Sequence, residues 1–169
     1  VVFRGAVGAD RAGTPLTTAS PMVVASVGKL VTALTVARLV QRGDLAVDDA
    51  VPWPDLLPPG PTFVDPGWSD VTVRELLDHT SGMPVARQSW LDDPGTCADP
   101  LTGLLRAPPT RDRGEWRYSN GNYCALGLLI EHLTGARYDA AARELLLDGA
   151  GVTGARLTVD GPLPGDAPY

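Results

Sequence analysis

The order of the expected secondary structure elements limits the folds that this chain can adopt. Residues 1–7 are apolar and β-prone, whereas the rest of the chain shows mainly helical patterns. A single strand cannot satisfy its own backbone hydrogen-bonding groups. We therefore expect either that this strand pairs with strands that the sequence does not reveal, on a second chain or in a missing segment, or that the chain is incomplete.

Five helices are predicted from apolar periodicity and from the residues that begin and end helices. The first stops at Gly43, and the second opens at a capping box formed by Thr72 and Glu75. Asp99 is the expected cap of the third helix. Residues 51–67 are rich in Pro and Gly and are predicted to form an ordered surface loop. The five helices are expected at about 27–42, 72–77, 99–106, 121–133 and 138–147.

Composition narrows the classes of function. Apolar residues make up 44% of the chain and charged residues 20%, which is typical of a folded globular protein. The formal charge of −6, without any basic run, argues against nucleic-acid binding. The longest apolar stretch, residues 30–40, is broken by Arg38 and is too short to span a membrane. The opening residues do not resemble a signal peptide, and a start at Val1 suggests a processed or trimmed chain.

The two cysteines, Cys97 and Cys124, allow one intramolecular pairing. In an exported protein a disulfide is expected, and closing that loop would contribute roughly 3–4 kcal/mol. In a cytosolic protein the same residues would more often be small buried apolar side chains, so the sequence leaves both alternatives open. The cysteines and the two histidines, His79 and His132, show no metal-ligand spacing. We therefore expect no metal and no organic cofactor.

Lys29 is the single lysine in a chain with thirteen arginines, and it lies one helical turn after Ser26. Both side chains therefore lie on one face at a helix start. A serine becomes a nucleophile when a neighbour takes its proton, which a lysine amine can do and an arginine cannot. The helix start also directs backbone N–H groups at an oxyanion formed on Ser26. The spacing alone favours an alternative, in which Ser26 caps the helix and Lys29 is a surface residue.

Tyr118 and Asn120 lie two residues apart just before a predicted helix. In an extended segment this spacing points both side chains the same way. Tyr118 could relay a proton, and Asn120 could hold a substrate carbonyl or orient Lys29. The alternative is a helix cap at Ser119 or Asn120 with a tyrosine packed beneath it. Together with the Ser26–Lys29 pair, a chance origin has a probability on the order of one in several hundred, so the two motifs favour a catalytic site.

Four stretches carry a family resemblance. Residues 26–29 read SVGK, and residues 43–49 end that helix with GDLAVDD. Residues 71–84 read VTVRELLDHTSGMP, and residues 118–127 read YSNGNYCALG. In this order and spacing they resemble the family of class C β-lactamases, D-alanyl-D-alanine carboxypeptidases and related esterases. The similarity runs from near residue 1 to about residue 160.

The resemblance implies an α+β, β-lactamase/transpeptidase-like fold, with a helical region and part of an antiparallel sheet. Residues 1–169 would be the N-terminal portion of a single catalytic domain whose C-terminal strands are missing from this chain. Ser26 would be the acylated nucleophile, Lys29 its proton acceptor and Tyr118 a general base in acylation or deacylation. Asn120 would bind the substrate amide. Among other polar residues, the resemblance implies structural roles for His79 and Ser81 and no catalytic role for Ser119, while His132 is expected to serve the C-terminal end of its helix.

The implied function is a serine hydrolase that acts through an acyl-enzyme. Its substrate would be a peptide ending in D-Ala, a β-lactam or a small ester or amide, and its location would be the cell envelope or the exterior. One departure is that the family's third motif, on a C-terminal strand, is missing. An alternative is therefore a non-catalytic sensor or binding module with this fold but without turnover. A weaker alternative is a structural helical domain with accidental motifs.

Overall fold

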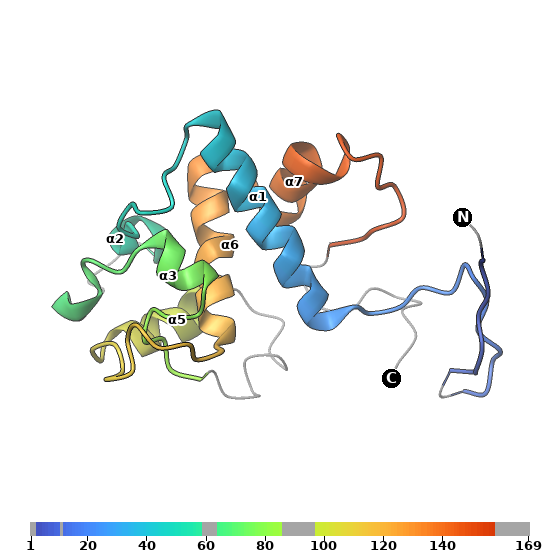
Figure 1. Ribbon diagram of the computed structural model, residues 1–169, viewed down its shortest axis with the longest axis horizontal. Coiled ribbons are helices and arrows are strands. Elements are labelled where there is room, and N and C mark those ends of the chain that lie inside the picture. The colour runs from blue at the N-terminus through green and yellow to red at the C-terminus, as the bar shows by residue number, and fades with distance from the viewer. Residues whose placement is uncertain (1–2, 11, 59–63, 86–96, 158–169) are drawn as a thin grey trace.

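A computed structural model describes residues 3–10, 12–58, 64–85 and 97–157 of the chain. Two long helices, α1 (Gly28–Arg42) and α6 (Asn120–Thr134), cross at the centre of the molecule (Figure 1). The shorter helices α2, α3, α5 and α7 also contact α6. The remaining elements are η1 (Ala25–Val27), α2 (Trp53–Leu56), η2 (Pro66–Trp68), α3 (Val73–Leu77), α5 (Ala98–Leu105), α7 (Tyr138–Ala142) and η3 (Arg143–Leu147).

The hydrophobic core lies around α6. Trp53 and Trp68 meet edge to face with ring centroids 5.8 Å apart. Their indole N–H groups donate to the carbonyl oxygens of Trp68 and Ala107, at 2.8 Å and 2.7 Å, so neither ring is buried with an unsatisfied donor. Further core side chains, all at most 1% exposed, are Val36, Leu39, Leu76, Met83, Leu101, Leu126, Leu129 and Ile130.

Most predicted helix ends are confirmed. Gly43 ends α1 and Gly135 ends α6, each with a positive φ that glycine adopts without a steric penalty. The Thr72–Glu75 capping box is present at the start of α3, with both reciprocal hydrogen bonds. The last predicted helix is observed as α7 followed directly by η3, in which the backbone adopts the wider π-helical turn.

Two predictions of local structure are wrong, and a third is not tested by this chain. Residues 3–7 form no strand within the described chain, where their backbone has no partner strand, and residues 1–2 lie outside the described residues. Pairing of this segment with strands elsewhere stays a prediction. Part of the predicted loop 51–67 is helical, since the apolar residues at 53, 56 and 57 are buried and fold this stretch onto the core; residues 59–63 lie outside the described residues. Asp99 is not a cap, because α5 begins one residue earlier, after Cys97.

The described chain contains isolated β-bridges instead of a sheet. One joins Ala50 to Thr72 and ties the segment after α1 to the start of α3, and the other joins Ala9 to Pro15 in the N-terminal arm. Residues 12–24 of that arm extend away from the helices (Figure 1). None of the described helices is long and apolar enough to cross a membrane.

Candidate active site

Ser26 lies in the short turn η1, immediately before α1. The preceding residue, Ala25, has a φ of 42°, which is uncommon for a residue with a Cβ atom. Neither η1 nor α1 has a side-chain cap, so the structure does not support the alternative that Ser26 caps the helix. Ser26 is exposed, and Lys29 is partly buried one turn later.

The four residues singled out in the sequence meet at one place. Ser26 Oγ lies 2.9 Å from Tyr118 Oη and 3.4 Å from Lys29 Nζ. Lys29 Nζ donates to Asn120 Oδ1 at 2.7 Å, and Tyr118 Oη donates to the same oxygen at 3.2 Å. Ser26 therefore has two groups within reach that could take its proton.

The environment of Tyr118 stabilises its phenolate form. Partial burial on its own would raise the pKa of the Tyr118 phenol. Polar contacts with Lys29 and Ser26 and the charge of Lys29 outweigh burial, so the pKa lies below its ordinary value of 10.0. Lys29 Nζ also lies 5.0 Å from the centroid of the Tyr118 ring and 5.7 Å from that of Tyr123. A tyrosine whose pKa is lowered beside a serine hydroxyl can act as a general base.

Ser119 anchors the backbone between Tyr118 and Asn120. Its extended backbone points the two neighbouring side chains to one side, as the spacing predicted. Its hydroxyl accepts from the N–H of Gly121 at 3.2 Å and donates to the carbonyl of Pro84 at 2.6 Å. The cap and the shared direction of the two neighbouring side chains are therefore compatible, since Ser119 caps α6 while Tyr118 contacts Ser26 and Asn120 contacts Lys29.

His79 and Ser81 are buried beneath this segment and do not contact Ser26. Ser81 Oγ donates to Asn122 Oδ1 at 2.6 Å, and Asn122 Nδ2 lies 3.0 Å from His79 Nδ1. These contacts agree with the structural roles expected for both residues. His132 is exposed in the last turn of α6, as expected.

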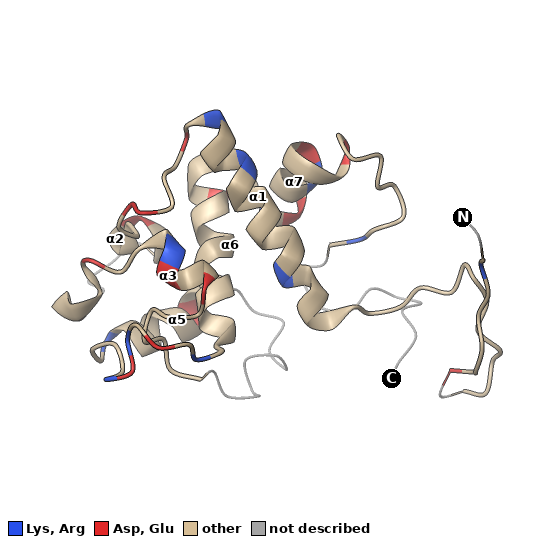
Figure 2. Ribbon diagram, in the orientation of Figure 1, with Lys and Arg blue, Asp and Glu red and all other residues tan. Residues whose placement is uncertain are grey.

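Arg113 holds the loop before Tyr118 against α3, and the sequence analysis did not single it out. Its guanidinium donates to both carboxylate oxygens of Glu75, at 2.8 Å and 3.1 Å, and to Asp70 at 2.6 Å. The two carboxylates raise the pKa of Arg113. Only the family resemblance of the stretch that contains Glu75 could have drawn attention to this contact. Across the described chain, Lys and Arg residues are scattered among Asp and Glu residues (Figure 2).

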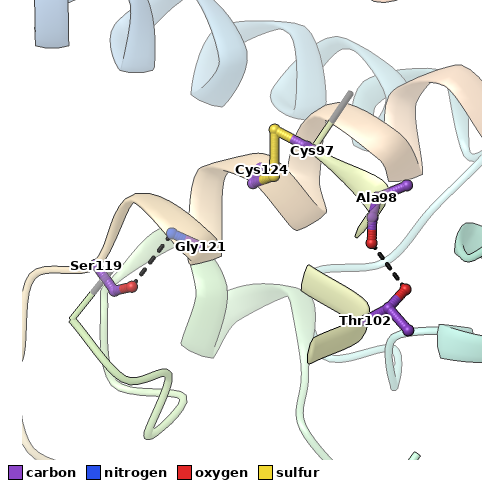
Figure 3. Close-up of a disulfide and its surroundings, with 6 residues drawn as sticks. All are labelled: Cys97, Ala98, Thr102, Ser119, Gly121 and Cys124. Atoms are coloured by element: carbon purple, nitrogen blue, oxygen red, sulfur yellow. Dashed lines mark hydrogen bonds between the residues drawn. A yellow bond between two sulfur atoms is a disulfide. The ribbon is translucent and has the colours of Figure 1, made fainter. Parts of the chain in front are cut away.

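Cys97 and Cys124 form a disulfide, which resolves the alternative that the sequence left open. Their Cα atoms are 5.6 Å apart, a usual separation for a disulfide. Figure 3 shows that the bond joins the start of α5 to α6, one turn beyond the Ser119 cap. The covalent loop therefore encloses Tyr118 and Asn120.

Within the described residues, no group of three or more His, Cys, Asp or Glu side chains could hold a metal ion.

Comparison with known proteins places this geometry in context. Penicillin-binding protein 4 of Amycolatopsis lactamdurans is 34% identical over 148 residues, which cover 83% of this chain and 37% of that protein. Esterase EstB of Burkholderia gladioli is 33% identical over 175 residues, 90% of this chain and 43% of the esterase. A crystal structure of a penicillin-binding protein from Bacillus halodurans has a TM-score of 0.73 and 25% identity, covering 95% of this chain and 52% of that one.

The chain thus spans less than half the length of these two curated relatives. The structural similarity supports a β-lactamase/transpeptidase-like fold, of which the described residues are mainly the helical part. The sequence also matches the Beta-lactamase family model over residues 1–166. The chain belongs to the β-lactamase family.

Proposed function

We propose that the protein is a serine hydrolase that forms an acyl-enzyme on Ser26. The observation that carries this proposal is the convergence of Tyr118 Oη and Lys29 Nζ on Ser26 Oγ, from segments about ninety residues apart in the chain. A serine hydroxyl beside a single proton acceptor is an ordinary surface hydrogen bond. A serine with a tyrosine of lowered pKa and an amine in reach is arranged for nucleophilic attack.

In the proposed acylation, Ser26 Oγ forms a bond to the substrate carbonyl carbon and gives up its proton. The Tyr118–Lys29 pair accepts that proton. The pair can do so as phenolate with ammonium or as phenol with amine, since these two forms hold the same number of protons and carry the same net charge. Tyr118 Oη is the nearer acceptor, at 2.9 Å. The same pair then delivers that proton to the leaving group as its bond to the carbonyl carbon breaks. In the second half-reaction the pair takes a proton from the water that attacks the acyl-enzyme, and returns it to Ser26 Oγ as the bond from Oγ to the carbonyl carbon breaks.

Asn120 has two roles in this proposal. Its Oδ1 atom accepts from Lys29 and Tyr118 and so orients both groups. With Oδ1 directed at these two donors, its Nδ2 group remains to donate to the carbonyl of a bound substrate amide. Asn120 is partly exposed, which leaves room for such a contact.

The substrate we propose is a peptide ending in D-Ala, a β-lactam or a small ester or amide. Relatives named penicillin-binding protein and esterase support this range. We further propose a location in the cell envelope or outside the cell. The Cys97–Cys124 disulfide supports this location, because disulfides persist in oxidising compartments.

We also propose that an antiparallel sheet, with strands beyond this chain, covers the outer face of α1. Val27, directly before α1, forms an apolar stripe with Leu30 and Leu34 of that helix, and each is at least 43% exposed. Leu34→Asp in the full-length protein should then lower the free energy of unfolding by several kcal/mol, which chemical denaturation would measure. A change within about 0.5 kcal/mol would contradict the sheet, because it is what an uncovered surface position gives.

The proposed activity can be tested by intact mass spectrometry of the full-length protein after incubation with a fluorescent penicillin and, separately, a fluorophosphonate. We expect a single adduct that is lost in Ser26→Ala and kept in Ser69→Ala, a control at another exposed serine. An adduct that survives in Ser26→Ala would contradict the assignment of the nucleophile. A penicillin adduct that never turns over would instead indicate a sensor or binding module.

A further inference from the structure

His79 occupies an unusual backbone position at the end of α3. Its φ is 60°, in the left-handed region that glycine adopts freely and other residues enter at a cost of about 1 kcal/mol. The side chain is nevertheless only 8% exposed. A backbone position that would suit glycine thus holds an imidazole pointed into the protein, which suggests that the ring itself is needed there.

The contacts of the ring define its protonation state. The backbone N–H of Ser119 donates to His79 Nδ1 at 3.2 Å, and a backbone N–H can only donate. Asn122 Nδ2 lies 3.0 Å from the same atom, while Asn122 Oδ1 is occupied by the hydroxyl proton of Ser81. Nδ1 must therefore be an unprotonated acceptor, and the neutral ring carries its hydrogen on Nε2.

The faces of the ring contact the tyrosines of the site. The centroid of the His79 ring lies 4.7 Å from that of Tyr118 and 5.1 Å from that of Tyr123, at interplanar angles of 36° and 38°. Tyr123 is fixed in turn by a hydrogen bond to the carbonyl of Leu77. His79 thus supports both the backbone after Tyr118, through Ser119, and the ring of Tyr118 itself.

We propose that His79 is a positioning residue, which in its neutral form holds Tyr118 where the phenol reaches Ser26. This inference rests on the proposed hydrolase function. His79 does not touch the reacting atoms and acts through Tyr118 and Ser119. A proton on Nδ1 would turn an acceptor into a donor facing two donors, so the support of the Tyr118 segment would be lost.

The surroundings of His79 favour the neutral form. Burial lowers the pKa of its imidazole below the ordinary value of 6.5, and the charge of Lys29 on α1 lowers it further, whereas Asp78 opposes both. Tyr118 and Tyr123 are the other titratable groups that face the ring. Because the pKa is lowered, the support is complete above pH 6.5 and is lost as the pH falls through the pKa of the folded protein. Acylation of Ser26 should therefore show an acid limb set by His79.

Two substitutions of His79 test separately the hydrogen bond accepted by Nδ1 and the contact of the ring with Tyr118. His79→Asn keeps an acceptor oxygen at the position of Nδ1, tolerates the positive φ and does not titrate between pH 4 and 8. His79→Phe keeps an aromatic ring against Tyr118 but removes the acceptor. His132→Asn, at the exposed second histidine, is the control.

The first measurement is the rate constant of Ser26 acylation against pH in the full-length protein, with thermal unfolding to confirm that each variant is folded. We expect His79→Asn to keep most of the neutral-pH rate and to lose the part of the acid limb that follows the titration of His79, which leaves the pH dependence of the Tyr118–Lys29 pair. His79→Phe should be slower by about 10- to 100-fold at every pH, because Tyr118 is misplaced. His132→Asn should keep the wild-type profile. An acid limb that is unchanged in His79→Asn would overturn the proposal.

The second measurement does not need activity. In the full-length protein, nitrogen NMR of the imidazoles should show His79 as the neutral Nε2–H form at neutral pH. The amide signal of Ser119 should shift as His79 titrates in acid, and that shift should disappear in His79→Asn. A proton on Nδ1 at neutral pH, or a Ser119 amide that ignores the titration, overturns the role of His79. Absence of acylation in the wild type would contradict the proposed function, while these two signals would still decide the role of His79.

Discussion

The two sides of the site differ in how completely this chain builds them. Tyr118 and Asn120 are supported by four buried polar residues that are linked by hydrogen bonds and are at most 8% exposed, namely His79, Ser81, Ser119 (through its backbone N–H) and Asn122. Ser26 and Lys29 lie at the exposed start of α1, beside an uncovered apolar stripe. The structure thus contains one supported side and one open side of the same site.

Because of this difference, we expect substitutions on the two sides to affect the free energy of unfolding and the rate of acylation to different degrees. On the supported side, a substitution leaves buried donors or acceptors without partners, which costs free energy of unfolding. On the open side, side chains have few packing partners in the described chain, so their loss affects the chemistry of Ser26 more than the fold. The predictions below test whether the two effects separate in this way.

The largest expected effect is on the open side. Lys29→Met removes the amine from the proton-accepting pair and should slow Ser26 acylation by about 10²- to 10⁴-fold. The free energy of unfolding should change by only about 0.5 kcal/mol, because Lys29 is partly exposed. Acylation kinetics and urea denaturation of the full-length protein would measure the two effects. Arg38→Met, on the exposed surface of the same helix, is the control, and equal slowing in both variants would refute the role of Lys29.

The next effect concerns the covalent loop on the supported side. Cys97 and Cys124 are 27 residues apart in the sequence, and closing such a loop contributes roughly 3–4 kcal/mol by restricting the unfolded chain. The double substitution to serine should lower the free energy of unfolding by about this amount. A reductant should destabilise the wild type equally and leave the double variant unchanged. Equal stability of the oxidised and reduced wild type would contradict the prediction.

A matched pair of asparagines on the supported side compares a buried supporting residue with a site residue that stands on it. Asn122 is fully buried and bonds to Ser81 and His79, so Asn122→Ala should cost about 2 kcal/mol of unfolding free energy. Asn120 lies two residues earlier and is partly exposed. Asn120→Ala should therefore lower the free energy of unfolding less than Asn122→Ala does, and should slow acylation more. Denaturation and acylation of both variants would give the comparison. If Asn120→Ala were the more destabilising of the two, the supporting role of Asn122 would be contradicted.

The sequence predicted the parts of this structure that depend on local chemistry. The end of the first helix at Gly43, the Thr72–Glu75 capping box and the helix predicted at about 121–133, observed as α6, follow from residue preferences within one or two turns. The shared direction of Ser26 with Lys29, and of Tyr118 with Asn120, follows from helical and extended spacing. That these two pairs face each other came only from the family resemblance, because no periodicity connects segments so far apart.

Other features depend on tertiary contacts that no local pattern reports. Helix α2 forms in a Pro-rich stretch because Trp53 and Leu56 are buried against the core. The predicted strand at the N-terminus has no partner among the described residues, so its β-prone composition alone did not produce a strand. Likewise, the bond from Arg113 to Glu75 joins residues with no detectable relation in the sequence.

That bond underlies the smallest predicted effect, which depends on pH. Burial would raise the pKa of the Glu75 carboxyl, but hydrogen bonds from Arg113 and Thr72 outweigh it and hold the pKa below the ordinary 4.5. The stabilisation is therefore present above pH 4.5 and is lost as the pH falls through the lowered pKa. Arg113→Met should cost about 1 kcal/mol at neutral pH, a modest value because the pair is partly exposed to solvent.

The difference between wild type and Arg113→Met should shrink in acid, since protonated Glu75 no longer attracts the guanidinium. Unfolding free energies at neutral pH and well below pH 4.5 would show this. Arg42→Met, which removes the more exposed Arg42–Asp44 pair, should have little effect at either pH. If the cost of Arg113→Met persisted unchanged in acid, Arg113 would act by packing its aliphatic stem under the loop. The supported side of the site would then be held at Arg113 by packing and not by the charge of the Arg113–Glu75 pair.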